Sequence, residues 1–276
     1  MRFQRVDGLA APLLSFVFFY GATLILWIWA GWPHVQWMGL IAVTIATVAT
    51  LAIWERGRWP LGLFVPPRQA VPELLRGLSW GFLLIVSCMA LIMAFTGIRA
   101  QPGNGFPWFE VLWVFAPAVL HEELLFRGYP FQKLLRWNRW LAQLFVAFLF
   151  AALHLGNESV TVLGLLNVFL GGIVLGLAYE RYGRLWFPIG FHLAWNLTTG
   201  PILGHEVSGY ESMRSILIET GSGPDLLTGG EFGVEGSVLM TLVELAAMAL
   251  LVRRISSARP ALRSEPEQPA MKELDQ

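Results

Sequence analysis

Six polar side chains stand out because they lie at or near the ends of long apolar stretches of the chain. They are Glu122, Glu123, Arg127, His154, His192 and Asn196. A carboxylate beside an imidazole can hold a water molecule and take its proton, which is general-base catalysis. A second imidazole and an amide group can donate hydrogen bonds to an oxyanion as it develops. Together these groups fit the hydrolysis of an amide bond by an activated water.

The same inventory permits a metal-dependent version of that chemistry. Two histidines and one glutamate form a ligand set known for catalytic zinc, with the fourth position left for a water molecule. The ligands in that case would be Glu122, His154 and His192. The residues alone leave both versions open.

Helical spacing predicts how these side chains meet. Glu123 and Arg127 are four residues apart with the acid first, which favours an ion pair on one helix face. Glu122 is rotated by about 100° from Glu123 and is expected to project to a different neighbour. His192 and Asn196 are one turn apart on a shared face. Three different helices would therefore bring these groups together inside a bundle.

The elements that position these residues are predicted to be membrane helices. Of the 276 residues, 55% are hydrophobic and only 14% charged, whereas a soluble domain carries roughly 25% charged residues. The apolar residues form blocks of about twenty, which is the length that crosses a bilayer core. This composition argues against a soluble enzyme, a nucleic-acid binder and a disordered protein.

We therefore predict an all-α, polytopic bundle of about eight transmembrane helices. Their expected spans are Gly8–Trp32, Val35–Trp54, Gly77–Ile98, Trp108–Phe126, Trp140–Leu155, Thr161–Tyr179, Leu185–Thr199 and Gly236–Val252.

The basic residues predict the orientation of the bundle. With eight spans, seventeen of the nineteen lysines and arginines fall on one side, and the other side holds only Arg99 and Arg214. The positive-inside rule then places both termini in the cytoplasm. We expect a multi-pass integral protein of a prokaryotic cell membrane.

The chain is predicted to form one membrane domain, residues 1–255, followed by a tail. The motifs occupy a core of roughly residues 60–200, and the Gly-rich segment 201–235 is expected to be an outer loop or cap. Residues 256–276 are rich in proline and charge, which predicts a disordered cytoplasmic tail.

The depth of the site residues raises a geometric question. In straight helices, Glu122 would lie about 21 Å along its span, near the cytoplasmic side, and His154 about 22 Å along its own, toward the outer side. Either the fourth and fifth helices extend beyond the cytoplasmic surface, carrying Arg136 and Arg139 into water, or these helices are strongly tilted or broken. We expect the former.

Three other polar groups fall in or beside predicted spans. His121, Asn167 and Glu244 are expected to satisfy packing partners, as polar side chains in helical bundles usually do, and not to take part in catalysis.

Three motifs, EExxxR, FxxxH and HxxxN, occur in this order on separate predicted helices. This combination resembles the CPBP family of intramembrane proteases, also called the Abi or Rce1-like family. Its members are bacterial and archaeal relatives of the eukaryotic CAAX prenyl endopeptidase. The resemblance covers roughly residues 60–200.

The resemblance implies roles for individual residues. Glu122 matches the family's water-activating glutamate and His154 its partner. His192 and Asn196 match the oxyanion-stabilising pair. The remaining residues of the first motif, Glu123 and Arg127, are assigned an orienting ion pair.

The implied activity is that of a hydrolase, an intramembrane endopeptidase that cleaves a membrane-associated, CAAX-like or peptide-precursor substrate. The family was first described as metalloproteases, and a glutamate-dependent mechanism is the later view. We expect no required cofactor, with a divalent metal such as zinc on Glu122, His154 and His192 as the alternative. The expected partners are the lipid bilayer and a peptide or protein substrate, with no nucleic acid, and the sequence indicates no oligomeric state.

A non-hydrolytic function stays open as a second hypothesis. Glutamate and histidine inside a membrane also serve as proton or ion relays. A transporter, or an immunity or scaffold protein on the same fold, would carry these residues without hydrolysing a peptide.

Overall fold

A computed structural model describes residues 7–31, 35–57 and 61–263 of the chain. Its helices are α1 (Asp7–Trp29), α2 (Val35–Trp54), α3 (Pro67–Phe95), α4 (Trp108–Glu110), α5 (Ala116–Phe126), α6 (Tyr129–Trp137), α7 (Arg139–Leu153), α8 (Val162–Tyr182), α9 (Trp186–Leu197), α10 (Asp225–Thr228) and α11 (Val238–Arg263). Two short strands, β1 (Arg99–Pro102) and β2 (Leu217–Thr220), accompany them. The protein is a helical membrane protein, as its composition predicted, with very little sheet.

Five helical segments of the described chain are long and apolar enough to cross a membrane. They are α1, α2, α3, α7 with the turn that follows it, and α8. The other three predicted spans are helical but are not among these five. A π-helical turn, Val111–Phe115, interrupts the fourth, and α11 carries Glu244 and four arginines. The predicted number of eight spans is therefore not confirmed.

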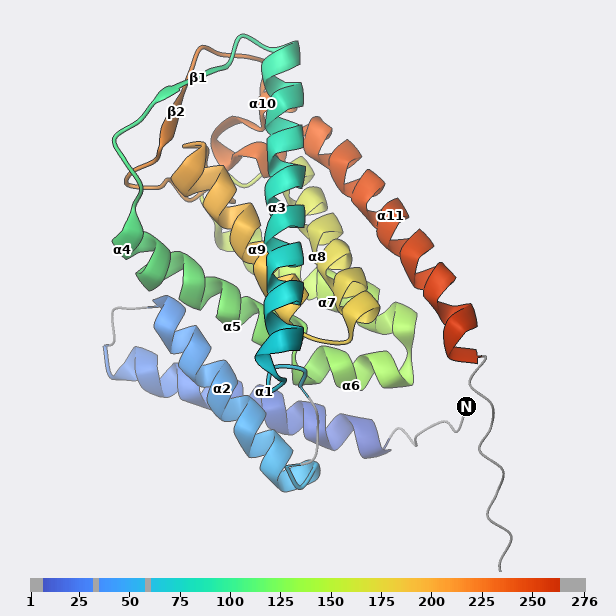
Figure 1. Cartoon of the computed structure of the whole chain (residues 1–276). Coiled ribbons are helices and arrows are strands. Elements are labelled where there is room, and N and C mark those ends of the chain that lie inside the picture. Colours follow the sequence, from blue (N-terminus) through green and yellow to red (C-terminus); the bar gives the residue numbers. More distant parts are fainter. Residues whose placement is uncertain (1–6, 32–34, 58–60, 264–276) are drawn as a thin grey trace, which may run out of the picture.

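The seventh predicted span, α9, is short because it is enclosed by protein. Eight of its twelve residues are buried, among them Phe187, Phe191 and Trp195. A helix covered by its neighbours on most sides does not need to match the thickness of a bilayer. In Figure 1, α9 lies among α3, α5 and α8.

Glycines allow α3 and α9 to pack backbone against backbone. A Cβ atom added at Gly77 would come within 2.2 Å of the Phe187 carbonyl oxygen, and one at Gly81 within 2.2 Å of the Phe191 oxygen. From the other side, a Cβ at Gly190 would meet the Leu74 oxygen at 2.3 Å. Small residues at such positions are what close helix contact in membranes requires.

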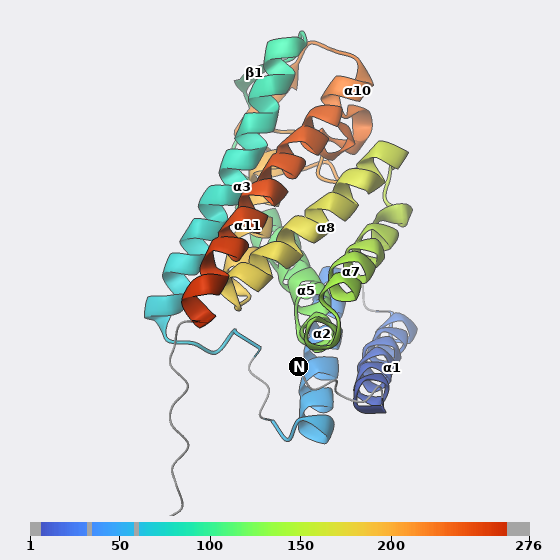
Figure 2. The same ribbon diagram turned by 90° about the vertical axis from the view of Figure 1, so that its right-hand side faces the viewer.

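The segment predicted as an outer loop is an ordered cap. Strand β2 pairs antiparallel with β1, with Arg99 opposite Thr220, which ties the cap to the end of α3. Phe232 and Val234 of this segment are fully buried. Figures 1 and 2 show β1 and α10 together at one end of the molecule, far from the N-terminal helices.

Two sequence-based expectations about helix ends are corrected. Helix α11 continues to Arg263, past the predicted start of the tail at residue 256, and residues 264–276 lie outside the described part of the chain. The fourth and fifth predicted helices are not extended either. A separate helix, α6, lies between them, and α5 runs obliquely across the direction of α3 (Figure 1). The inclination of α5 favours the tilted alternative over the expected extension.

Candidate active site

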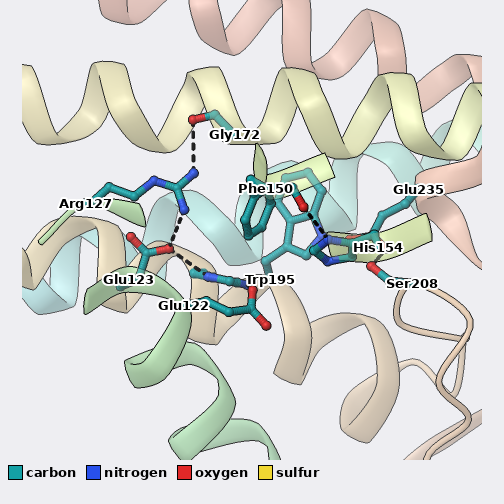
Figure 3. A network of polar contacts seen from close by, with 10 residues as sticks. Glu122, Glu123, Arg127, Phe150, His154, Gly172, Trp195, Ser208 and Glu235 are labelled. Atoms are coloured by element: carbon teal, nitrogen blue, oxygen red, sulfur yellow. Dashed lines mark hydrogen bonds and ion pairs between the residues drawn. The ribbon is translucent and has the colours of Figure 1, made fainter. Parts of the chain in front are cut away.

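The end of α5 carries a buried ion pair. The Arg127 Nη1 atom lies 3.2 Å from Glu123 Oε1, and Nη2 donates a hydrogen bond to the Gly172 carbonyl of α8 at 3.0 Å. Both side chains are almost completely buried. This confirms the pair predicted from the four-residue spacing, and Figure 3 shows Arg127 between α8 and Glu123.

His192 of α9 lies between two carboxylates. Its Nδ1 atom is 2.8 Å from Glu123 Oε1, and its Nε2 atom is 3.7 Å from Glu122 Oε2. The prediction that the two glutamates project to different neighbours is therefore wrong, because they approach the two nitrogens of one imidazole. Since a paired carboxylate only accepts, Nδ1 is the donor toward Glu123. The Arg127–Glu123 pair thus fixes the orientation of the His192 ring.

His154 has its ring orientation fixed by the backbone. It begins the 3₁₀ turn that ends α7, and its Nδ1 lies 2.8 Å from the Phe150 carbonyl oxygen. A carbonyl can only accept, so Nδ1 carries the proton, and in the neutral ring Nε2 is left with a free lone pair. Such a nitrogen can accept a proton or a hydrogen bond from water.

Phe150, the first residue of the FxxxH motif, packs against both histidines. Its ring centroid is 4.8 Å from that of His154 and 6.1 Å from that of His192. The Arg127 guanidinium carbon lies 4.8 Å from the centre of the same ring. Sequence reasoning treated Phe150 only as part of a pattern, whereas it is the apolar wall that holds these groups in place.

The predicted residues meet at one cavity. It has a volume of about 230 Å³, and its wall includes Glu122, His154, His192 and Asn196. The Glu122 side chain is 25% exposed and that of Glu123 is 0% exposed. Water can therefore reach Glu122, while Glu123 is confined to its contacts with Arg127 and His192.

Sequence reasoning missed the contribution of the cap. Glu235 lines the cavity, accepting hydrogen bonds from the Trp195 indole at 2.9 Å and from the Ser208 hydroxyl. In the sequence, Glu235 was only the last residue of a Gly-rich loop, and nothing in its spacing connects it with α9. A contact of this kind depends on how the cap folds back.

For the other polar groups of the predicted spans, the structure agrees with the predicted packing role in some cases and differs from it in one. Asn167 donates to the carbonyl oxygens of Glu235 and Ser237 at 2.7 and 2.8 Å, which confirms a partner-satisfying role. His121 lies 2.8 Å from the Tyr20 hydroxyl on α1. Glu244 differs from the prediction, because it lines the cavity and its Oε2 has no hydrogen-bond partner among the described residues.

The donor set does not form a metal site in this arrangement. Among the described residues, no three histidine, cysteine, aspartate or glutamate side chains approach closely enough to share a metal ion. Glu122 and His192 Nε2 do approach each other, at 3.7 Å, but no third donor from the described residues joins them.

The fold and the site together define a helical membrane protein with a carboxylate–imidazole cluster enclosed by its helices. Residues 104–198 match the family model described as type II CAAX prenyl endopeptidase Rce1-like. The match includes all six residues that the motifs singled out, and it supports the resemblance to the Rce1-like CAAX protease family that the motifs predicted. A search of curated proteins finds no match to this chain.

Proposed function

We propose that this protein is an intramembrane endopeptidase that cleaves a peptide bond of a membrane-associated substrate with a water activated by Glu122. The observation that carries the proposal is the convergence of Glu122, His154, His192 and Asn196 from α5, α7 and α9 on one cavity. The match of residues 104–198 to a CAAX endopeptidase family supports the same reaction class.

In the proposed reaction Glu122 is the general base. Its carboxylate takes a proton from a water molecule, and the Nε2 lone pair of His154 accepts a hydrogen bond from the same water. The water oxygen attacks the carbonyl carbon of the scissile bond. When the C–N bond breaks, the proton on Glu122 passes to the leaving nitrogen, so the products are a new carboxyl group and a new amine.

His192 and Asn196 are proposed to stabilise the oxyanion that forms on the carbonyl oxygen. They are one turn apart on α9, and both line the cavity. Asn196 donates through its side-chain amide, and protonated His192 donates through Nε2–H while Glu123 holds Nδ1. Glu123 and Arg127 act through His192, so they are positioning residues.

The test compares purified protein with two single variants on a library of membrane-anchored peptides in liposomes. Glu122→Gln removes the base, and cleavage is expected to fall at least about a hundredfold. Glu211→Gln removes an exposed carboxylate of the cap and should leave cleavage unchanged. Equal cleavage by the Glu122 variant, or Glu122-dependent ion flux without cleavage, would contradict the proposal and favour a transporter.

We propose that the reaction needs no metal ion. Metal content of the pure active protein is measured by mass spectrometry, and cleavage is assayed before and after treatment with a chelator. We expect activity without a stoichiometric metal. Activity that disappears with the chelator and returns with zinc would contradict this part of the proposal.

A further inference from the structure

The cavity has a second polar wall that the proposed hydrolysis does not use. It is built by α8, α11 and the cap, which contribute Asn167, Gly171, Glu244 and Glu235. The residues proposed to act in hydrolysis come from α5, α7 and α9. The two walls share the space in which a substrate would lie.

Glu244 is the unusual member of this wall. The residue is 1% exposed, and its Oε2 has no hydrogen-bond partner among the described side chains and backbone groups. Asn167 cannot supply one, because its amide group already donates to two backbone carbonyls. A buried carboxyl oxygen left without a partner is costly, which suggests that a ligand provides one.

The packing around Glu244 leaves room for its carboxyl group. A Cβ atom at Gly171 of α8 would lie 3.1 Å from Glu244 Oε1, so a larger residue at this position would crowd the carboxyl. Thr241, one turn earlier on α11, bonds Asn167 at 2.7 Å and fixes α11 against α8. This bond ties α11 to α8 one turn before Glu244, which lines the cavity.

The charge of the cavity indicates which ligand would fit. Its wall includes three glutamates, Glu122, Glu235 and Glu244, and no lysine or arginine from the part of the chain that the structure describes. Both carboxyl oxygens of Glu235 already accept hydrogen bonds. On this second wall a cationic group would therefore find a free acceptor, on Glu244, in a cavity whose wall is negatively charged and also includes the indole of Trp195.

We propose that this wall is a subsite for a cationic group of the substrate, an ammonium or guanidinium, with Glu244 as its counter-ion. The proposal rests on the proposed function in taking the ligand to be a peptide. Two sources share this chemistry, namely a lysine or arginine side chain near the scissile bond and the free amino terminus of a peptide.

The test measures binding, so that it does not depend on turnover. The protein carries Glu122→Gln, and the probes are decapeptides with a C-terminal hexadecyl amide and one lysine moved through each position. Norleucine at the same position is the matched neutral residue, and each peptide is made with a free and with an acetylated amino terminus. Affinities are measured by fluorescence anisotropy in detergent micelles.

If the cation is a side chain, the peptide with lysine at one position should bind at least tenfold more tightly than the peptide with norleucine there. If the cation is the amino terminus, the free peptide should bind at least tenfold more tightly than the acetylated one. A second substitution, Glu244→Gln, should abolish that preference, whereas Glu211→Gln should preserve it. If Glu244→Gln does not fold, n-butylammonium chloride should compete with the cationic peptide for the Glu122→Gln protein but not with the neutral one.

Equal affinity for cationic and neutral peptides at every position, or a preference that persists in the Glu244→Gln protein, would overturn the proposed subsite. These results are distinguishable from a failure of the proposed function. A protein that binds lysine through Glu244 but never cleaves would refute the peptidase and keep the subsite, and a peptidase without cation preference would do the reverse.

Discussion

At the residue scale, a series of contacts between charged groups holds His192 in a fixed orientation. Arg127 bridges Glu123 and the Gly172 carbonyl, and Glu123 in turn engages His192 Nδ1. Because this arginine and glutamate are buried together, each is the counter-charge of the other. Removing one partner of a buried ion pair lowers the free energy of unfolding by more than the net contribution of the pair, because the other charge is left buried without a partner.

Arg127→Lys tests whether these contacts position His192. A lysine ammonium cannot reproduce the planar pair of hydrogen bonds to Glu123 and Gly172. We expect a loss of about 1–3 kcal/mol in the free energy of unfolding and a fall in kcat at least tenfold greater than any change in KM. Thermal unfolding in micelles and steady-state cleavage measure the two effects.

The matched control is Arg214→Lys on the exposed surface of the cap, which should change neither quantity. If the Arg127 variant has wild-type stability and wild-type kcat, Arg127 does not orient His192 through Glu123.

At the element scale, the position of the site depends on the close contact between α3 and α9. Gly81→Val is expected to prevent that contact, because even a Cβ atom would come within 2.2 Å of a backbone oxygen of α9. Overpacking of this kind costs 1–3 kcal/mol or more.

Thermal unfolding of purified protein measures the effect of Gly81→Val. Gly21→Val in α1 is the control, since a Cβ atom there meets nothing within 4 Å. Equal unfolding temperatures for the two variants would show that the close contact between α3 and α9 does not contribute to stability.

The cap contains a cluster whose charges change with pH. His205 is buried, with Nδ1 3.0 Å from Glu206 Oε2 and Nε2 3.8 Å from Glu219 Oε1. Burial opposes the imidazolium, but the hydrogen bond to Glu206 and the charge of Glu219 outweigh it and raise the pKa of His205. Burial raises the pKa of Glu219, whereas the bond to His205 outweighs burial at Glu206 and lowers its pKa.

These directions predict a cap that loosens in alkaline solution. A group whose pKa is raised on folding contributes stability below its unfolded pKa, about 6.5 for histidine, and loses that contribution as pH rises through the folded value. The contribution of Glu206 is lost at the opposite end, as pH falls below about 4.3. The protection factors of the β2 amides, which correct the exchange rate for its intrinsic dependence on pH, are therefore expected to be lower at pH 8.5 than at pH 6.

His205→Gln should remove most of this difference in protection factor between the two pH values. A difference that is unchanged in the variant would show that other groups control the cap.

At the scale of the whole molecule, composition predicted the class of fold and motif spacing predicted the site. The apolar blocks located α1, α2, α7 and α8 to within a few residues. The number of spans did not follow, because hydropathy does not distinguish a lipid-facing helix from α9, whose neighbours are protein.

The contact partners of the site residues were only partly predictable. The Glu123–Arg127 pair follows from periodicity within one helix. The approach of both glutamates to His192 depends on the tilt of α5, and the roles of Glu235 and Glu244 depend on how the cap and α11 close over the cavity. Those are tertiary relations, which local spacing does not specify.

The orientation in the membrane is still a prediction from the charge distribution. In a Cys88→Ala background, a cysteine at exposed Glu211 of the cap should react with an impermeant maleimide in intact cells. A cysteine at exposed Arg181 should react only after permeabilisation. The reverse pattern, or labelling of both positions in intact cells, would contradict cytoplasmic termini.

The central claim is that Glu122 activates a water molecule that attacks the peptide carbonyl directly. Its most direct test is a single-turnover cleavage in ¹⁸O-labelled water, with mass spectrometry of the new carboxyl terminus. We predict one solvent oxygen in the product of the first turnover, and no product from the Glu122→Gln protein on the same timescale. A first-turnover product without the label would show that a protein carboxylate attacked instead, and labelled product at the normal rate from Glu122→Gln would remove Glu122 from the reaction.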